Sequence, residues 1–339
     1  MNPPPPAADI LRRTRALARP ALRVAVDRLS PRLRPPVEYH LGWTDLDGNP
    51  VDGDGGKHVR AALAVLSASA VGTDESVGVA GAVAIELVHN FSLIHDDLMD
   101  DDGERRHRPT VWAAFGPASA ILAGDALMTL AVQVLAEQPG PGAQRALRAL
   151  TAATAHMIEG QADDLAFESI GDVSLAECVA MARAKTGALL GCASELGALL
   201  ADAAAPPVDA LGTFGRELGL AFQAVDDVLG IWGDPEVTGK PVRSDLRQGK
   251  QTIPVVAALE GAGAAGPELR SLLDASRESD GAAERAAGLV ERCGGRAVAD
   301  DIARSSLAAA LEALGGADVK PGVAAELEQI ALFVVGRDR

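Results

Sequence analysis

Two short acidic clusters are the features of this chain that most clearly indicate chemistry. The first is Asp-Asp-Leu-Met-Asp at residues 96–100, and the second is Asp-Asp-Val-Leu-Gly at residues 226–230. Each follows an apolar stretch of helical periodicity, so carboxylates four positions apart, such as Asp96 and Asp100, lie on one face of a helix. Grouped carboxylates repel one another unless cations lie between them, and their hard oxygen atoms suit Mg²⁺. The clusters therefore predict divalent cations that join protein carboxylates to a substrate phosphate.

Basic residues follow both clusters. Arg105 and Arg106 come after the first, and Lys240 and Lys250 come after the second. Taken singly, such a cation is most often a solvated surface charge, and one isolated acidic motif is most often a solvated helix end. The same order of acids and bases at two places favours a site that holds a polyphosphate with its metal ions.

Helices must position these groups, because apolar residues recur at helical spacing along most of the chain. Helices are expected over residues 57–71, 77–100, 117–136, 142–168, 174–201, 207–233, 250–261, 266–276, 283–293, 296–314 and 321–334. Gly and Pro separate these segments, and the alternation typical of strands is absent. We predict an all-α fold, a single large helical bundle with polar sites on helices that face its interior.

The N-terminal segment differs from the rest in composition. Residues 1–37 are rich in Pro and Arg and contain no continuous apolar run, so a secretory signal is not expected. An amphipathic helix over residues 8–30, interrupted near Pro20, is one interpretation. We prefer an arm that is partly disordered or docked on the surface. The predicted organisation is this arm followed by one catalytic domain over residues 38–339.

Composition limits the class of protein further. The 339 residues carry a formal net charge of -16 without a basic stripe, so nucleic acid is not an expected partner. No transmembrane segment is expected, because Asp125 interrupts the apolar stretch over residues 120–136. Three widely spaced cysteines argue against a disulfide framework and favour a cytoplasmic location.

Further segments follow one family pattern in its order along the chain, at residues 55–60, 86–97, 105–110, 222–227 and 244–254. With these motifs the chain resembles the trans-isoprenyl diphosphate synthase (polyprenyl synthetase) family, especially geranylgeranyl diphosphate synthases. The resemblance implies a helical bundle around a deep central cavity that condenses an allylic diphosphate with isopentenyl diphosphate. It also implies a homodimer with several Mg²⁺ ions per active site, which Mn²⁺ is able to replace.

The resemblance assigns the acidic clusters to ionisation of the allylic diphosphate, whose departing charge the metal ions neutralise. The implied metal ligands are Asp96, Asp97, Asp100, Asp226 and Asp227. The family usually has a third aspartate where this chain has Gly230, so the second cluster lacks one carboxylate. Asp234, one further turn along the helix, is the candidate to replace it.

The resemblance also divides the basic residues between two diphosphates. The allylic diphosphate is expected to meet Arg105, Lys185 and Lys240. The isopentenyl diphosphate, which must stay attached to its carbon and therefore uses no metal, is expected to meet Lys57, Arg60, His89 and Arg106. The fork of an arginine suits phosphate oxygen atoms. The catalytic set implied in this way is Asp96, Asp100, Lys185, Asp226, Asp227 and Lys240.

Other positions match the family less specifically. Thr186, Gln223 and Lys250 are expected near the reacting groups. Gln161 and Asp164 share one helix face, and a catalytic and a packing role remain equally open for both. His58 stands where the family commonly has arginine, which weakens the match of this pocket slightly, although a protonated His58 is still able to donate to the diphosphate.

Two residues before the first cluster bear on product length. Phe91 precedes Asp96 by five positions, roughly 7.5 Å deeper along the helix axis. We interpret its ring as a floor that closes the tunnel for the growing prenyl chain, with the small Ser92 beside it. In the family, one aromatic residue with a small neighbour resembles enzymes that stop at a C20 product. Phe91 as ordinary core, and a farnesyl or longer product, remain the alternatives.

Two other functions are open on sequence alone. A class I terpene cyclase uses the same metal-assisted ionisation but has no use for a second diphosphate pocket. A non-catalytic subunit of a heteromeric synthase would have little reason to keep both acidic clusters with their cations. The chain therefore fits a prenyltransferase better than either alternative.

Overall fold

The computed structural model describes residues 4–51, 53, 56, 58–168, 171–234 and 242–336, and its regular structure is almost entirely helical. The all-α prediction is thus confirmed. The chain forms two units, which are described separately. The first comprises Met1–Thr154, Leu189–Thr213 and Ala313–Ile330, and the second comprises Ala155–Ala188, Phe214–Glu312 and Ala331–Arg339.

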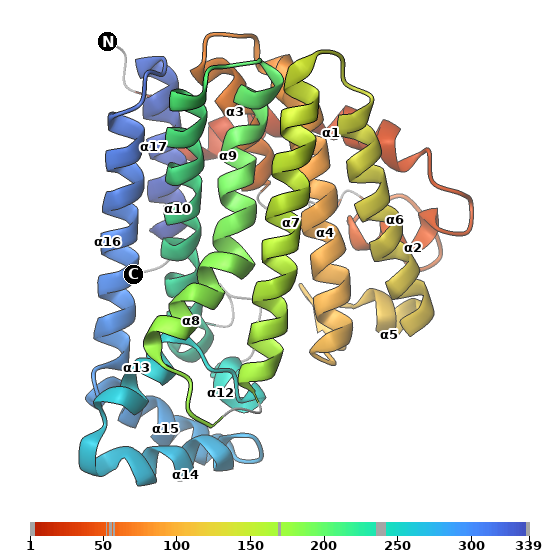
Figure 1. Cartoon of the computed structure of the whole chain (residues 1–339). Coiled ribbons are helices and arrows are strands. Elements are labelled where there is room, and N and C mark those ends of the chain that lie inside the picture. Colours follow the sequence, from red (N-terminus) through yellow and green to blue (C-terminus); the bar gives the residue numbers. More distant parts are fainter. Residues whose placement is uncertain are drawn as a thin grey trace. The chain divides into compact units, whose positions relative to one another are not determined.

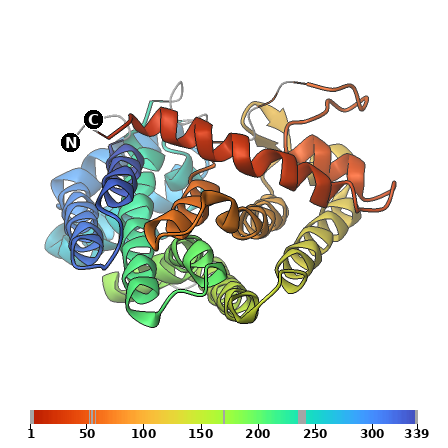
Figure 2. The ribbon, with the colours of Figure 1, turned by 90° about the horizontal axis from the view of Figure 1, so that it is seen from above.

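The first unit is built around helix α4 (Val79–Met99), which follows the short 3-10 helix η1 (Glu75–Gly78). Buried apolar side chains such as Leu87 and Ile94 occur around most of α4, so it needs neighbours on several sides. Those neighbours are α3 (Val59–Ala70), α6 (Pro117–Ala136) and α1 (Ala7–Val26), which crosses α3 and α4 (Figures 1 and 2). Helix α9 (Ala188–Leu200) also belongs largely to this unit.

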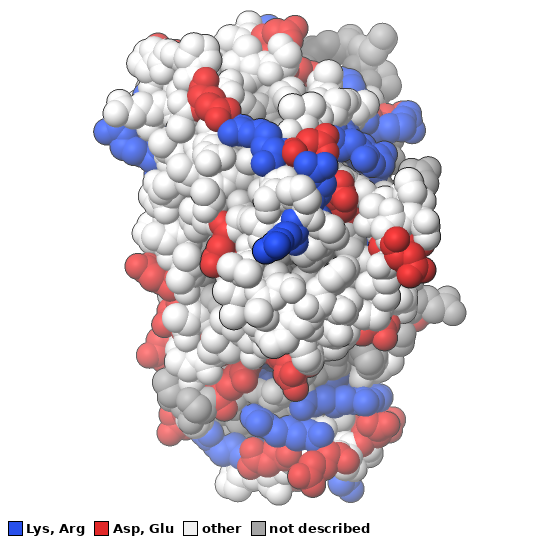
Figure 3. Space-filling model, turned by 90° about the vertical axis from the view of Figure 1, so that its right-hand side faces the viewer, with Lys and Arg blue, Asp and Glu red and all other residues white. Residues whose placement is uncertain are grey.

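Helix α6 keeps one of its apolar faces in solvent. Ile121 and Leu122 are 47% and 56% exposed, although the helix has a mean hydropathy of 1.7 over its most apolar window. Figure 3 shows an extended area without charged side chains on the face of the molecule that includes α6. An exposed apolar helix face of this kind is typical of an association surface.

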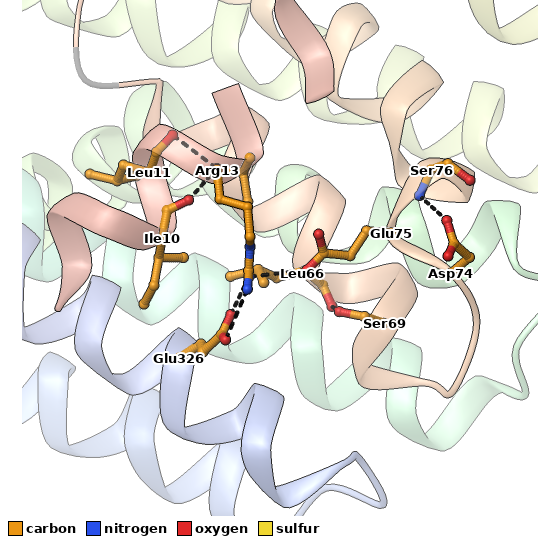
Figure 4. A network of polar contacts seen from close by, with 10 residues as sticks. Ile10, Leu11, Arg13, Leu66, Ser69, Asp74, Glu75, Ser76 and Glu326 are labelled. Atoms are coloured by element: carbon orange, nitrogen blue, oxygen red, sulfur yellow. Dashed lines mark hydrogen bonds and ion pairs between the residues drawn. The ribbon is translucent and has the colours of Figure 1, made fainter. Parts of the chain in front are cut away.

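The N-terminal segment is a helix docked on the first unit. Helix α1 runs without interruption past Pro20, and Ile10, Leu11, Ala18 and Leu22 on one side are buried. Its Arg13 pairs with Glu75 at 3.0 Å and with Glu326 at 2.5 Å (Figure 4). Burial of one face therefore outweighs the loss of one helical hydrogen bond at proline. The predicted division at residue 38 stays a prediction, and helix α2 (Arg34–His40) crosses that position.

The second unit contains the C-terminal parts of α7 (Pro141–Phe167) and α10 (Ala205–Trp232). Between them lie α8 (Leu175–Ala182) and the π-helical turn η2 (Arg183–Gly187). The remaining elements are α12 (Ser244–Gln248), α13 (Ile253–Gly261), η3 (Gly263–Ala265), α14 (Gly266–Ser276), α15 (Asp280–Arg292), α16 (Gly295–Gly315) and α17 (Pro321–Val335). Helices α16 and α17 each have residues in both units. Two groups of buried apolar side chains, around Ile231 and around Leu220, form cores of this unit.

Every helix expected from periodicity is present to within a few residues, although η2 interrupts the one expected over residues 174–201. Among the described residues, the elements missed were α2, α5 (Val111–Phe115), α12, the 3-10 helices η1 and η3, and the antiparallel hairpin of β1 (Glu104–Arg105) and β2 (Arg108–Pro109). Each is too short to show a period. By length and composition alone, Glu75–Met99 and Pro117–Ala136 are apolar enough to cross a membrane. Core helices pass the same test, so the expected absence of a transmembrane segment stays a prediction.

Candidate active site

The first acidic cluster lies at the C-terminal end of α4, where the helix macrodipole disfavours negative charge. Asp97 is 1% exposed, and its Oδ1 accepts a hydrogen bond from Arg105 Nε at 2.6 Å. Its Oδ2 is buried without a hydrogen-bond donor among the described residues. Burial raises the pKa of Asp97 to about 6, although Arg105 acts in the opposite direction. A buried acceptor without a donor, on a carboxylate whose other oxygen accepts from Arg105, fits a role as cation ligand.

A group of cations and a neutral histidine gathers in the same unit. Arg60 Nη1 donates to His89 Nε2 at 3.4 Å, which leaves Nδ1 to carry the imidazole proton. Burial, and then the charges of Arg60 and Arg106, lower the pKa of His89 well below its usual value, so the ring is neutral at physiological pH. The guanidinium of Arg106 lies against Gly56, where a Cβ would approach Arg106 Nη2 to 2.9 Å. These residues of the predicted isopentenyl diphosphate pocket are thus brought together, whereas Lys57 lies outside the described residues.

His58 contacts the carboxylate of Glu86, the first residue of the segment 86–97, for which no role was expected. His58 Nδ1 lies 3.1 Å from Glu86 Oε2, and the backbone N–H of Ala61 donates to Glu86 Oε1 at 3.1 Å. Burial raises the pKa of Glu86, but the hydrogen bond and charge of His58 and the charge of Arg60 outweigh burial and lower it. His58, which has a left-handed backbone (φ +50°), therefore ties the N-terminal end of α3 to α4. Glu86 had one sequence signal: it lies three residues before His89 on a buried helix.

In the second unit, three predicted residues form a chain of hydrogen bonds. Thr186 Oγ1 donates to Gln223 Oε1 at 2.6 Å, and Gln223 Nε2 donates to Asp227 Oδ1 at 2.7 Å. Asp227 Oδ2 accepts from the backbone N–H of Ile253 at 2.9 Å. Burial raises the pKa of Asp227 to about 8, against the effect of these donors. The adjacent Asp226 is exposed, so the pair combines a buried, oriented carboxylate with an accessible one.

The position of the missing third aspartate is occupied by another carboxylate. A Cβ built on Gly230 would lie 1.9 Å from Asp245 Oδ2 and 2.4 Å from its Cγ, so the carboxylate of Asp245 rests directly on this glycine. Ser244 Oγ donates to Asp245 Oδ1 at 3.1 Å. Asp245 therefore places a negative charge next to the second cluster, where sequence analysis had put forward Asp234.

Two predicted lysines share a pair of acidic side chains. Lys185, in the π-helical turn η2, lies 2.6 Å from Asp164 Oδ2, and Lys250 lies 2.6 Å from Glu168 Oε1 and 3.6 Å from Asp164 Oδ2. Asp164 is therefore an ion-pair partner of both lysines, and Glu168, a partner of Lys250, was not among the residues expected in the site. The amide of Gln161 is buried without a hydrogen-bond partner in the described part of the chain. Lys240 lies outside that part.

The two product-length candidates take different sides of α4. The ring of Phe91 meets the imidazole of His95 edge-to-face at 4.9 Å, and His95 Nε2 lies 3.1 Å from the Ile121 carbonyl oxygen on α6. Ser92 is four residues before Asp96 and therefore shares its helix face, and its hydroxyl donates to the His89 carbonyl at 2.9 Å. Ser92 is therefore on the same face of α4 as the first acidic cluster. Phe91 is 9% exposed and packs toward α6.

Among the described residues, no group of three His, Cys, Asp or Glu side chains is close enough to hold a metal ion. Asp96, Asp97 and Asp100 belong to the first unit, and Asp226 and Asp227 belong to the second.

A helical fold with two acidic clusters and the basic residues near them is typical of prenyl-transferring enzymes that ionise a diphosphate. The family model described as polyprenyl synthetase matches residues 51–290, and the chain belongs to that family. It is a transferase of the prenyl diphosphate synthase type.

Named relatives agree with this assignment. The chain is 47% identical to (2E,6E)-farnesyl diphosphate synthase of Mycobacterium tuberculosis over 347 residues, with 99% of this chain and 97% of the relative covered. It is 44% identical to geranylgeranyl diphosphate synthase of the same organism, with 93% and 91% covered. The crystal structure of polyprenyl synthetase from Streptomyces coelicolor A3(2) is 52% identical and superimposes with a TM-score of 0.92, with 96% of this chain and 99% of that chain covered.

Proposed function

We propose that this enzyme is a short-chain trans-prenyltransferase that condenses an allylic diphosphate with isopentenyl diphosphate. The observation that carries the proposal is the group of Arg60, neutral His89 and Arg106 in the same unit as the Asp97–Arg105 pair. A cationic pocket beside an acidic cluster suits two diphosphates that need opposite treatment. One must leave, and the other must remain bonded to its carbon.

Divalent cations, Mg²⁺ first and Mn²⁺ as a substitute, fit the carboxylates of the two clusters. The residues that would hold them are Asp96, Asp97, Asp100, Asp226 and Asp227. The buried, donor-free Oδ2 of Asp97 supports this assignment. When bound, the metal ions neutralise the charge that develops on the departing diphosphate.

The protein's own groups supply binding and orientation. Arg105 is held by Asp97, so its guanidinium is fixed for a phosphate oxygen. Lys185 and Lys250 form ion pairs with Asp164 and Glu168. An allylic diphosphate is a stronger anion than these carboxylates, so it would replace them as the partner of the two ammonium groups. The hydrogen bond from Thr186 to Gln223 orients the side-chain oxygen atoms of both residues. Their partial negative charge suits a cationic transition state. The carbocation is then attacked by the double bond of isopentenyl diphosphate, whose proton is lost to the released diphosphate.

The test is incubation with an allylic diphosphate, with and without isopentenyl diphosphate and with and without Mg²⁺. Elongated diphosphates that require both the second substrate and the metal support the proposal. A cyclic hydrocarbon formed without isopentenyl diphosphate would establish a terpene cyclase instead. No product with any allylic starter would favour a non-catalytic subunit.

We propose geranylgeranyl diphosphate as the main product, because Phe91 is the one bulky side chain of the Phe91–Ser92 pair. Farnesyl diphosphate is the second candidate, favoured by the name of the relative that is 47% identical. Product chromatography after dephosphorylation distinguishes these two chain lengths.

Ser92→Phe should shift the product toward farnesyl, because a ring at this position points along the helix face of Asp96. Phe91→Ala should lengthen the product, since it opens space between α4 and α6, with Leu87 and Val88 as a deeper limit. Chromatography of the dephosphorylated products, normalised to total turnover, measures both shifts. An unchanged distribution in both variants would show that the tunnel closes elsewhere.

We further propose that the enzyme is a homodimer that associates through the exposed face of α6. Leu122→Asp places a charge among apolar side chains and should convert the dimer to a monomer, measured by light scattering. The matched control is Val24→Asp, which charges another exposed apolar position, 67% accessible, on α1. A Leu122→Asp variant that retains the mass of the wild type would contradict the assignment of this surface.

A reducing, cytoplasmic compartment suits the cysteines. Cys178, Cys192 and Cys293 are free thiols. Burial raises the pKa of the Cys178 and Cys192 thiols, so both remain protonated and unreactive at physiological pH.

A further inference from the structure

The hairpin that carries Arg105 and Arg106 closes through an unusual turn. Arg105 pairs with Arg108, so Arg106 and His107 form a two-residue loop. Both have left-handed backbones, with φ of +53° and +60°. Turns of this kind normally use Asn-Gly because side chains of other residues are strained in that conformation. A strained turn persists only where surrounding contacts hold it, and such strain collects at functional sites.

The second strand of the hairpin is held by Tyr39, the single tyrosine of the chain. The Tyr39 hydroxyl donates to the Pro109 carbonyl at 2.8 Å, and the guanidinium of Arg108 lies 4.2 Å from the centroid of the Tyr39 ring. Tyr39 is 4% exposed and meets the ring of Phe115 edge-to-face at 5.3 Å. Arg108 Nη2 also donates to the Thr44 carbonyl at 2.9 Å. The return strand is therefore anchored to α2 and to the segment after it.

The first strand has a separate anchor. Arg105 Nε is bound by Asp97 at 2.6 Å, and Asp97 belongs to α4. Loss of Tyr39 would therefore leave the return strand with only its remaining contacts, such as that of Arg108 with the Thr44 carbonyl, and loosen the turn at Arg106, while Arg105 keeps its own anchor. Arg105 and Arg106 thus depend on different supports.

We propose that Tyr39 is a positioning residue for isopentenyl diphosphate. By holding the return strand it keeps the strained turn closed, and this keeps the guanidinium of Arg106 against Gly56. Tyr39 itself does not touch the substrate. The inference rests on the proposed function, because it takes Arg106 as a ligand of isopentenyl diphosphate and Arg105 as a ligand of the allylic diphosphate.

The test measures isopentenyl diphosphate affinity by calorimetry in metal-free buffer, which needs no turnover. Tyr39→Leu removes both the hydroxyl and the ring beneath Arg108, and should weaken this affinity at least tenfold. Tyr39→Phe removes only the hydroxyl and should weaken it about threefold. In steady-state assays the KM for isopentenyl diphosphate should rise accordingly, while the KM for the allylic substrate changes by less than twofold. Trp232→Leu, which deletes an aromatic ring covered by Arg296 in the second unit, is the matched control and should leave this affinity unchanged.

His107→Gly provides the rescue, because glycine adopts φ +60° without strain and the turn then needs less support. In the Tyr39→Leu background, His107→Gly should raise the affinity for isopentenyl diphosphate at least threefold. Unchanged affinity in a folded Tyr39→Leu variant, or equal weakening toward both substrates, would overturn the proposal. If Tyr39→Leu does not fold, unchanged affinity in Tyr39→Phe overturns it. A wild-type protein that does not bind isopentenyl diphosphate would refute the proposed function itself.

Discussion

Alanine at Asp96 or at Asp227 is expected to reduce turnover on the order of 10²–10³-fold, the scale of losing one preorganised electrostatic group in an active site. The two variants should differ in stability. Asp96 lies in a crowded acidic helix end, so Asp96→Ala should leave the melting temperature without metal equal or higher. Asp227→Ala deprives Gln223 and the Ile253 N–H of a buried acceptor, and should lower it.

Steady-state assays and thermal melts with and without Mg²⁺ measure these effects. Asp101→Asn is the matched control, because Asp101 follows the same helix but has a left-handed backbone beyond its end, where asparagine fits. It should change turnover by less than threefold. Turnover near that of the wild type in either alanine variant would show that the aspartate replaced in it is not a metal ligand.

Gly230→Asp, which introduces the aspartate usual in the family, is expected to impair this enzyme rather than improve it. Its Cβ would lie 1.9 Å from Asp245 Oδ2, so the carboxylate of Asp245 must move, and a further negative charge joins the second cluster. Turnover should fall about tenfold or more, and the Mg²⁺ concentration for half-maximal activity should rise. Turnover is expected to fall because the carboxylate of Asp245 already fills the space that a side chain at residue 230 would need.

The double variant Gly230→Asp/Asp245→Ala decides whether Asp245 supplies the missing charge. It keeps the number of carboxylates and removes the clash, so it should recover most of the activity that either single variant loses. Asp234→Asn is the control for the alternative candidate and should have little effect. Calorimetric Mg²⁺ titration with bound inorganic pyrophosphate gives a readout without turnover. Additive losses in the double variant would show that Asp245 and Gly230 are not coupled.

Local patterns in the sequence determined the helices and the types of residue in the site. The period of apolar residues predicts a helix from its own residues, and the spacing of Asp96 and Asp100 puts both on one face wherever that helix packs. Short elements without a period, such as α2 and the hairpin of Arg105 and Arg106, were missed for the same reason. The helicity of α1 past Pro20 depends on burial against other helices, which local propensity does not report.

Only the tertiary structure decided how each polar atom is used. The contact between His58 and Glu86 joins residues 28 positions apart, and that between Tyr39 and Pro109 joins residues 70 positions apart. The sequence likewise contains no sign that Asp245 rests on Gly230, or that Asp227 is buried while Asp226 is exposed. Residue type and local spacing determine which groups are available. Their pKa values, partners and accessibility depend on packing between segments that are distant along the chain.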